Sequence, residues 1–215
     1  MTNALEGRQS ELGDKTRRDF LYVAAASMAA VGAIATAWPF VNSLNPAFDT
    51  IAAGAPVDVD ISKVQPGQQI AVRWRSHPIF ILNRMPAALR QLQQANIVDL
   101  LADPDSTVNQ QPQYARNWHR SIKPEYLVVV GICTHLGCIP QLRGAPGGSL
   151  GRDWPGGYFC PCHGSRYDLA ARVFKGVPAP YNLPVPPHRF VSTQILRIGE
   201  NPAGSNFDLG SIVQL

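Results

Sequence analysis

The hydrophobic positions of this chain form one long run near the N-terminus and many short runs after it. From Phe20 to Val41, a stretch of 22 residues, no side chain is charged. A helix rises 1.5 Å per residue, so this run would reach about 33 Å, enough for a hydrocarbon core of roughly 30 Å. We therefore predict a transmembrane helix over residues 19–41.

After residue 56 the apolar runs are short and typical of strands. Val57–Ile61 and Gln69–Arg75 alternate between apolar and polar residues, as strands with one buried face do. Continuous apolar runs occur at Pro78–Leu82 and Tyr126–Ile132, and a further short strand-like segment, Phe190–Ile198, follows near the end of the chain. One helix is predicted at Ala87–Ala95, and the polar stretch Asp103–Lys123 is predicted to be a long loop. The pattern predicts a mainly β, antiparallel domain over residues 57–215.

Charged residues around the long run indicate its orientation. Lys15, Arg17 and Arg18 lie shortly before it. The next basic residue is Lys63, so the positive-inside rule places residues 1–18 in the cytoplasm and the β domain outside. The segment Thr16–Leu21 resembles a twin-arginine export signal, which carries folded proteins. Ala35-Thr36-Ala37 would fit a cleavage site, but the length of the run favours an uncleaved anchor.

Composition and the remaining segment limit the possible classes of protein. Residues 42–56 have no hydrophobic period and contain Asn, Pro and Gly, which predicts a flexible hinge. The 215-residue chain is 45% hydrophobic and 16% charged, which argues against a disordered chain. The net charge is only +4, and no dense Lys/Arg run follows the N-terminus, so we expect no nucleic-acid partner.

All four cysteines lie in two short clusters that also contain histidine. The clusters are Cys133–Cys138, with the sequence CTHLGC, and Cys160–Ser165, with the sequence CPCHGS. Two thiolates and two imidazoles suit either a tetrahedral zinc ion or a [2Fe–2S] cluster with two histidines on one iron. We interpret the two spare cysteines, Cys138 and Cys162, as equivalent positions, which suggests a disulfide. A structural zinc site would leave that pair unexplained.

The two clusters resemble the motifs of the Rieske iron–sulfur family, Cys-x-His-x-Gly-Cys and Cys-x-Cys-His-Gly. The resemblance implies a Rieske-type β domain with a cluster-binding subdomain and one [2Fe–2S] cluster per subunit. It implies four ligands: Cys133, His135, Cys160 and His163. It also implies a Cys138–Cys162 disulfide, and hydrogen bonds from Ser165 and Tyr167 to a bridging sulfide and a cysteine sulfur.

The expected ligand set has consequences for redox chemistry. Two ferric ions, two sulfides and two thiolates sum to zero charge, so an electron is added more easily than to a four-thiolate cluster. The expected potential is about −150 to +300 mV, against roughly −400 mV for plant-type ferredoxins. An imidazole on ferric iron is more acidic and regains its proton on reduction. The resemblance makes His163 the quinol-facing ligand, although spacing alone does not separate it from His135.

Two smaller features accompany the clusters. Leu136 follows a proposed ligand and is expected to belong to an apolar docking tip. Gly176–Pro180 resembles the proline-rich third loop of the family, with Val177 where a proline is usual. Prolines fix φ, so this loop should be stiff.

The resemblance implies an oxidoreductase function, that of the iron–sulfur subunit of a ubiquinol–cytochrome c reductase in the inner membrane of a bacterium. The implied partners are ubiquinol, a cytochrome b and a c-type cytochrome, in a dimeric complex with the cluster domain in the periplasm. One alternative is a Rieske subunit of another periplasmic oxidoreductase, such as arsenite oxidase. The other is a zinc-stabilised interaction module without a redox role.

Overall fold

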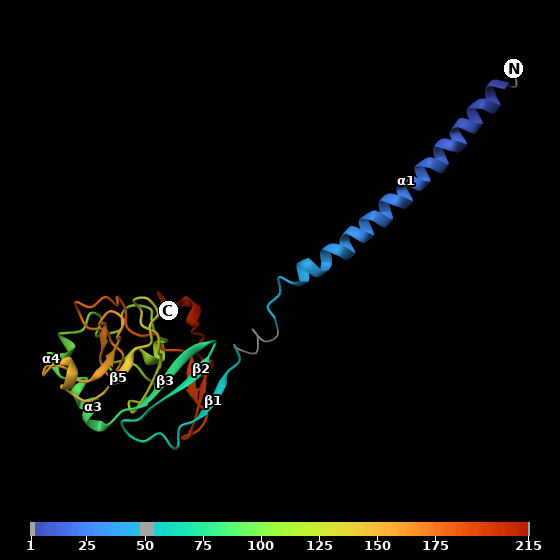
Figure 1. Cartoon of the computed structure of the whole chain (residues 1–215). Coiled ribbons are helices and arrows are strands. Elements are labelled where there is room, and N and C mark those ends of the chain that lie inside the picture. The colour runs from blue at the N-terminus through green and yellow to red at the C-terminus, as the bar shows by residue number, and fades with distance from the viewer. Residues whose placement is uncertain (1–2, 48–53, 215) are drawn as a thin grey trace. The chain divides into compact units, whose positions relative to one another are not determined.

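The computed structural model describes residues 3–47 and 54–214 (Figure 1). The chain divides into two units, Met1–Ile51 and Ala52–Leu215, and each is described by itself. The central part of the predicted hinge, residues 48–53, lies outside the described residues.

The first unit contains one helix, α1, over Asn3–Asn42. It begins 16 residues before the predicted start at residue 19, because residues 3–18 contain no proline and are rich in good helix formers such as Leu, Glu, Gln, Lys and Arg. The part from Arg17 to Asn42 is long and apolar enough to cross a membrane. Pro39 lies inside the helix, which ends three residues later.

The second unit is built mainly from three antiparallel sheets, each with three strands. The first sheet has the order β1 (Val57–Asp60), β9 (Ile195–Ile198), β8 (His188–Phe190). The second has the order β2 (Gln69–Trp74), β3 (His77–Asn83), β4 (Tyr126–Val130). The third has the order β5 (Gln141–Arg143), β6 (Gly157–Phe159), β7 (Arg166–Tyr167). The predicted mainly β, antiparallel class is confirmed.

Strands β3 and β4 of the middle sheet are buried on both faces, which explains the continuous apolar runs in their sequences. Along β3, Ile79 and Ile81 belong to a core shared with the first sheet. Phe80 and Leu82 point the other way, into the core that contains both free cysteines. Phe80 stacks there on Tyr158 of β6, with ring centroids 5.9 Å apart. The third sheet and its loops therefore pack against one face of the middle sheet.

Two predicted elements are divided in the structure. Phe190–Ile198 is not one strand, because Ser192 Oγ accepts the N–H groups of Gln194 and Ile195 and reverses the chain into the β8–β9 hairpin. The predicted helix Ala87–Ala95 is two short helices: α3 (Pro86–Gln91) and α4 (Ala95–Val98). Between them, the Leu92 carbonyl accepts from a buried arginine side chain, Arg172.

The stretch Asp103–Lys123 is a loop, as predicted, but much of it is buried. Its only helix is the short 3₁₀ turn η1 (Gln113–Ala115). Buried polar side chains within it include Ser106, Gln110, Gln111, Arg120 and Ser121. Outside this loop, the domain has two further 3₁₀ turns, η2 (Gly148–Leu150) and η3 (Leu209–Ser211). A buried loop must satisfy most of its polar groups inside the protein, and this one donates hydrogen bonds to the carbonyls of Ala170, Ala171 and Leu183.

Candidate metal centre

The two cysteine clusters form two loops with the same backbone hydrogen bonds. In each loop the N–H of the first cysteine donates to the carbonyl of the sixth residue, and the N–H of the fifth residue, a glycine, donates to the carbonyl of the first. The distances are 2.7 and 3.0 Å in residues 133–138, and 2.8 and 3.0 Å in residues 160–165. Gly137 and Gly164 have φ of +83° and +79°, and a Cβ on either would meet no atom within 4 Å. The backbone conformation alone therefore favours glycine.

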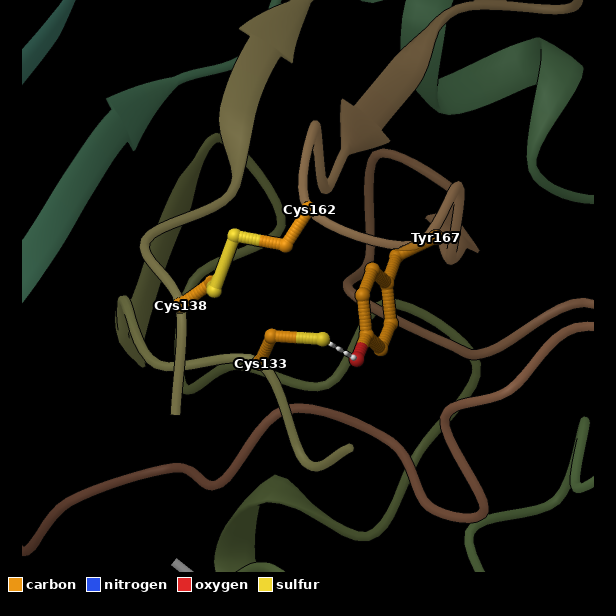
Figure 2. Close-up of a disulfide and its surroundings, with 4 residues drawn as sticks. All are labelled: Cys133, Cys138, Cys162 and Tyr167. Carbon is orange, nitrogen blue, oxygen red and sulfur yellow. Dashed lines mark hydrogen bonds between the residues drawn. A yellow bond between two sulfur atoms is a disulfide. The ribbon is translucent and has the colours of Figure 1, made fainter. Parts of the chain in front are cut away.

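This match between the loops corrects the interpretation that the two spare cysteines are equivalent. Cys138 is the sixth residue of its loop and corresponds to Ser165, whereas Cys162 is the third residue and corresponds to His135. A disulfide nevertheless joins Cys138 and Cys162, with their Cα atoms 6.6 Å apart (Figure 2). It therefore links the two loops at unlike positions.

The other two cysteines are free thiols, and both are buried. Burial raises the pKa of the Cys160 thiol, and the neighbouring Cys133 thiol raises it further. Cys160 Sγ also lies within 4.8 Å of both disulfide sulfurs, but bonded sulfurs are not thiolate ligands, so the three do not form a metal site. The Cys160 thiol, which burial keeps protonated, would become a thiolate beside a bound cation.

The two histidines of the loops lie against each other. Their ring centroids are 4.7 Å apart and the rings are perpendicular. Nδ1 of His135 is buried and has no hydrogen-bond partner among the described residues, which is costly for a polar atom unless a ligand satisfies it. His163 is exposed. The loops thus bring together two thiols and two imidazoles, a donor set that fits a [2Fe–2S] cluster with two histidines on one iron.

Tyr167 contacts one of these thiols. Its hydroxyl lies 3.2 Å from Cys133 Sγ (Figure 2) and accepts the N–H of Thr134 at 3.3 Å. The Thr134 hydroxyl donates to the carbonyl of Tyr181 at 2.7 Å. Burial raises the pKa of Tyr167, so its hydroxyl keeps the proton that it can donate to sulfur.

Ser165 is also buried and directs a hydroxyl into the same region. Its Oγ accepts the N–H of Ala179 at 3.0 Å, which ties the second cysteine loop to the Gly176–Pro180 loop. The hydroxyl proton has no acceptor among the described protein atoms and remains able to bond a further group.

Three buried arginines surround one buried carboxylate, and sequence reasoning missed all four residues. Arg84, Arg120 and Arg172 are nearly inaccessible, and Arg172 pairs with Asp168 at 2.7 Å. Burial lowers the pKa of Arg120 to about 9 and that of Arg84 to about 10. A signal existed in the sequence, since Asp168 and Arg172 are the only charged residues of the apolar segment 167–174.

The surface around His163 is partly apolar. Leu136, on the first cysteine loop, is 72% exposed, and Ile139, directly after that loop, is 58% exposed. A cavity of about 570 Å³ has His163 in its wall, together with Trp154, Phe174 and Lys175. The exposed imidazole is therefore reachable by a partner or a small molecule.

Comparison with known proteins adds independent observations. Residues 8–47 match the family model described as "Ubiquitinol-cytochrome C reductase Fe-S subunit TAT signal", and residues 100–187 match the Rieske [2Fe-2S] domain. The ubiquinol-cytochrome c reductase iron-sulfur subunit of Allochromatium vinosum is 51% identical over 189 residues, 87% of this chain and 90% of that protein. The protein of that name from Blastochloris viridis is 51% identical over 197 residues, 90% of this chain and 98% of that protein. A solved structure described as hyperthermophilic respiratory Complex III covers 80% of this chain and 97% of its own, at 22% identity and a TM-score of 0.44.

Proposed function

The chain belongs to the family of the ubiquinol-cytochrome c reductase iron-sulfur subunits, and from that premise we propose that it takes an electron from ubiquinol and delivers it to a c-type cytochrome. The main support for this proposal is that the two cysteine loops bring together two buried thiols and two imidazoles, one of which is exposed. A membrane-anchored complex with cytochrome subunits is the setting that the names of the relatives support.

The proposed ligands are Cys133, His135, Cys160 and His163, which would hold one [2Fe–2S] cluster. When bound, the cluster supplies a one-electron acceptor with a potential above that of four-cysteine clusters. The chain itself shields the cysteine sulfurs from water, since Cys133 and Cys160 are each about 1% exposed. The Tyr167 hydroxyl, 3.2 Å from Cys133 Sγ, would donate to that sulfur as a thiolate, and the Ser165 hydroxyl would donate toward a sulfide. Hydrogen bonds to the sulfurs stabilise added negative charge and so raise the potential.

His163 is the residue that we propose to meet ubiquinol. His163 is exposed, whereas His135 is half-buried, so the His163 imidazole is the more accessible of the two to an outside molecule. Its imidazole would accept the proton that leaves ubiquinol with the electron. The apolar side chains of Leu136 and Ile139 would pack against cytochrome b and exclude water there.

The membrane arrangement is part of the same proposal. Residues 1–18 would lie in the cytoplasm, residues 19–41 would cross the inner membrane once, and residues 57–215 would lie in the periplasm of a dimeric complex. Residues 42–56 would act as the hinge that lets the cluster domain move between cytochrome b and the c-type cytochrome. At no more than about 3.6 Å per residue, such a linker reaches tens of ångströms.

The test is an EPR spectrum of ascorbate-reduced membranes, with iron, sulfide and zinc analysis of the purified chain. We expect two irons and two sulfides per chain, and loss of the signal in Cys133→Ala. His77→Ala, at a histidine outside the loops, is the matched control and should keep the signal. Zinc in place of iron, or a full signal in Cys133→Ala, would refute the proposal. Copurification with b- and c-type haem separates this function from that of another periplasmic oxidoreductase.

A further inference from the structure

We propose that Arg120, in the buried loop 103–123, is a positioning residue for the electron-transfer site. Its guanidinium holds both segments that define the hydrogen bond between the Tyr167 hydroxyl and Cys133 Sγ, and thereby keeps the reduction potential high. The inference rests on the proposed function, because it concerns the potential of the cluster bound there.

The first segment held by Arg120 is the turn directly after Tyr167. Arg120 Nη1 donates to the carbonyls of Ala170 at 3.2 Å and Ala171 at 3.0 Å. Ala171 has φ of +58°, a left-handed conformation that an alanine adopts only when its surroundings enforce it. The Asp168 carboxylate closes the turn by accepting the N–H groups of Ala170 and Arg172. Because Asp168 follows Tyr167 directly, movement of this turn moves the tyrosine.

The second segment held by Arg120 leads to the other side of the same hydrogen bond. Arg120 Nη2 donates to the Leu183 carbonyl at 2.9 Å. Leu183 lies two residues after Tyr181, whose carbonyl accepts the hydroxyl of Thr134. Thr134 follows Cys133 and donates its own N–H to the Tyr167 hydroxyl. Arg120 therefore holds the tyrosine through one segment and the residue beside the cysteine through the other.

The two segments are also joined to each other, so the guanidinium completes a closed frame. The N–H of Leu183 donates to the Ala171 carbonyl at 3.0 Å, the same carbonyl that Arg120 binds. Gln111 Oε1 accepts from Arg120 Nη2 at 3.0 Å and holds the guanidinium in place. A planar guanidinium with several fixed donors can bridge such divergent carbonyls, whereas a lysine ammonium cannot reach all of them.

A purely structural role is the competing explanation, since removing any fully buried arginine should destabilise the domain. The two explanations differ in the reduction potential of the molecules that remain folded. Arg120→Lys retains the positive charge but loses the bridge. Leu196→Ala is the matched control, because Leu196 is fully buried but belongs to the core shared with the first sheet, whereas Ala170, Ala171 and Leu183 belong to the other core.

The experiment is an EPR-monitored redox titration of the full-length, cluster-loaded protein, together with thermal unfolding. We expect Arg120→Lys to lower the midpoint potential in the same direction as Tyr167→Phe. We expect the double variant Arg120→Lys/Tyr167→Phe to match Tyr167→Phe alone, because the bond that Arg120 positions is then absent. Leu196→Ala should lower the unfolding temperature and leave the midpoint unchanged.

Several results would overturn the inference. A wild-type midpoint in Arg120→Lys with a normal cluster signal would make Arg120 structural only. Fully additive shifts in the double variant would mean that Arg120 acts by another route than Tyr167. If Arg120→Lys fails to assemble the cluster, the Gln111→Met variant is titrated instead, because it removes one hydrogen bond to the guanidinium. A midpoint potential below that of the wild type then supports the inference, and an unchanged midpoint potential refutes it. Absence of a cluster in the wild-type protein would instead refute the proposed function.

Discussion

The disulfide between Cys138 and Cys162 gives the sharpest quantitative prediction. It closes a loop of 24 residues in sequence separation. In the chain-entropy model, restricting the unfolded chain at that loop length is worth about 3.4 kcal/mol at 25 °C. A domain of this size loses roughly 2–4 °C in unfolding temperature per kcal/mol. Cys138→Ser should therefore unfold roughly 7–14 °C below the wild type.

The assay is thermal unfolding of the purified full-length protein, followed by circular dichroism, with and without a thiol reductant. Cys162 is exposed and its partner is half-buried, so the reductant can reach the bond. The reductant should lower the wild-type transition toward that of Cys138→Ser and leave the variant unchanged. The double variant Cys138→Ser/Cys162→Ser should match the single one. A Cys138→Ser transition within about 2 °C of the wild type would refute the reasoning.

The other predictions concern the hydrogen bonds, the loop backbone and pH. Tyr167→Phe removes a bond that strengthens by about 1 kcal/mol on reduction, so redox titration should show a midpoint lower by about 40 mV; Ser165→Ala should shift it in the same direction. Gly164→Ala forces alanine to φ near +79°, and urea unfolding should show a loss of roughly 1–2 kcal/mol. Burial lowers the pKa of His188 to about 4, so the unfolded chain binds an extra proton below about pH 6.5. Stability should fall between pH 6.5 and 4, by on the order of 3 kcal/mol for this residue, and urea unfolding of His188→Phe should show a smaller fall over that range.

Features that depend on local chemistry could be predicted from the amino-acid sequence alone. The uncharged run of residues 20–41 needs nothing beyond its own composition to predict a membrane span. The two cysteine loops are local as well, since each closes on itself through hydrogen bonds between its first, fifth and sixth residues and requires a glycine at the fifth. Strands β1 and β2 followed from the period of their apolar residues, and β3 and β4 followed from continuous runs because both of their faces are buried. The short strands β5, β6 and β7 were not predicted.

Only the tertiary structure decided which distant groups meet. Cys138 and Cys162 occupy unlike positions of their loops, so their bond depends on how the loops face each other. Arg120 looked like one charge in a polar loop, yet it is fully buried because carbonyls from residues 170, 171 and 183 converge on it. These hydrogen bonds join residues 50 or more positions apart, so no local period in the sequence predicts them. The physical reason is that a buried polar group takes whatever partner the packing brings within reach.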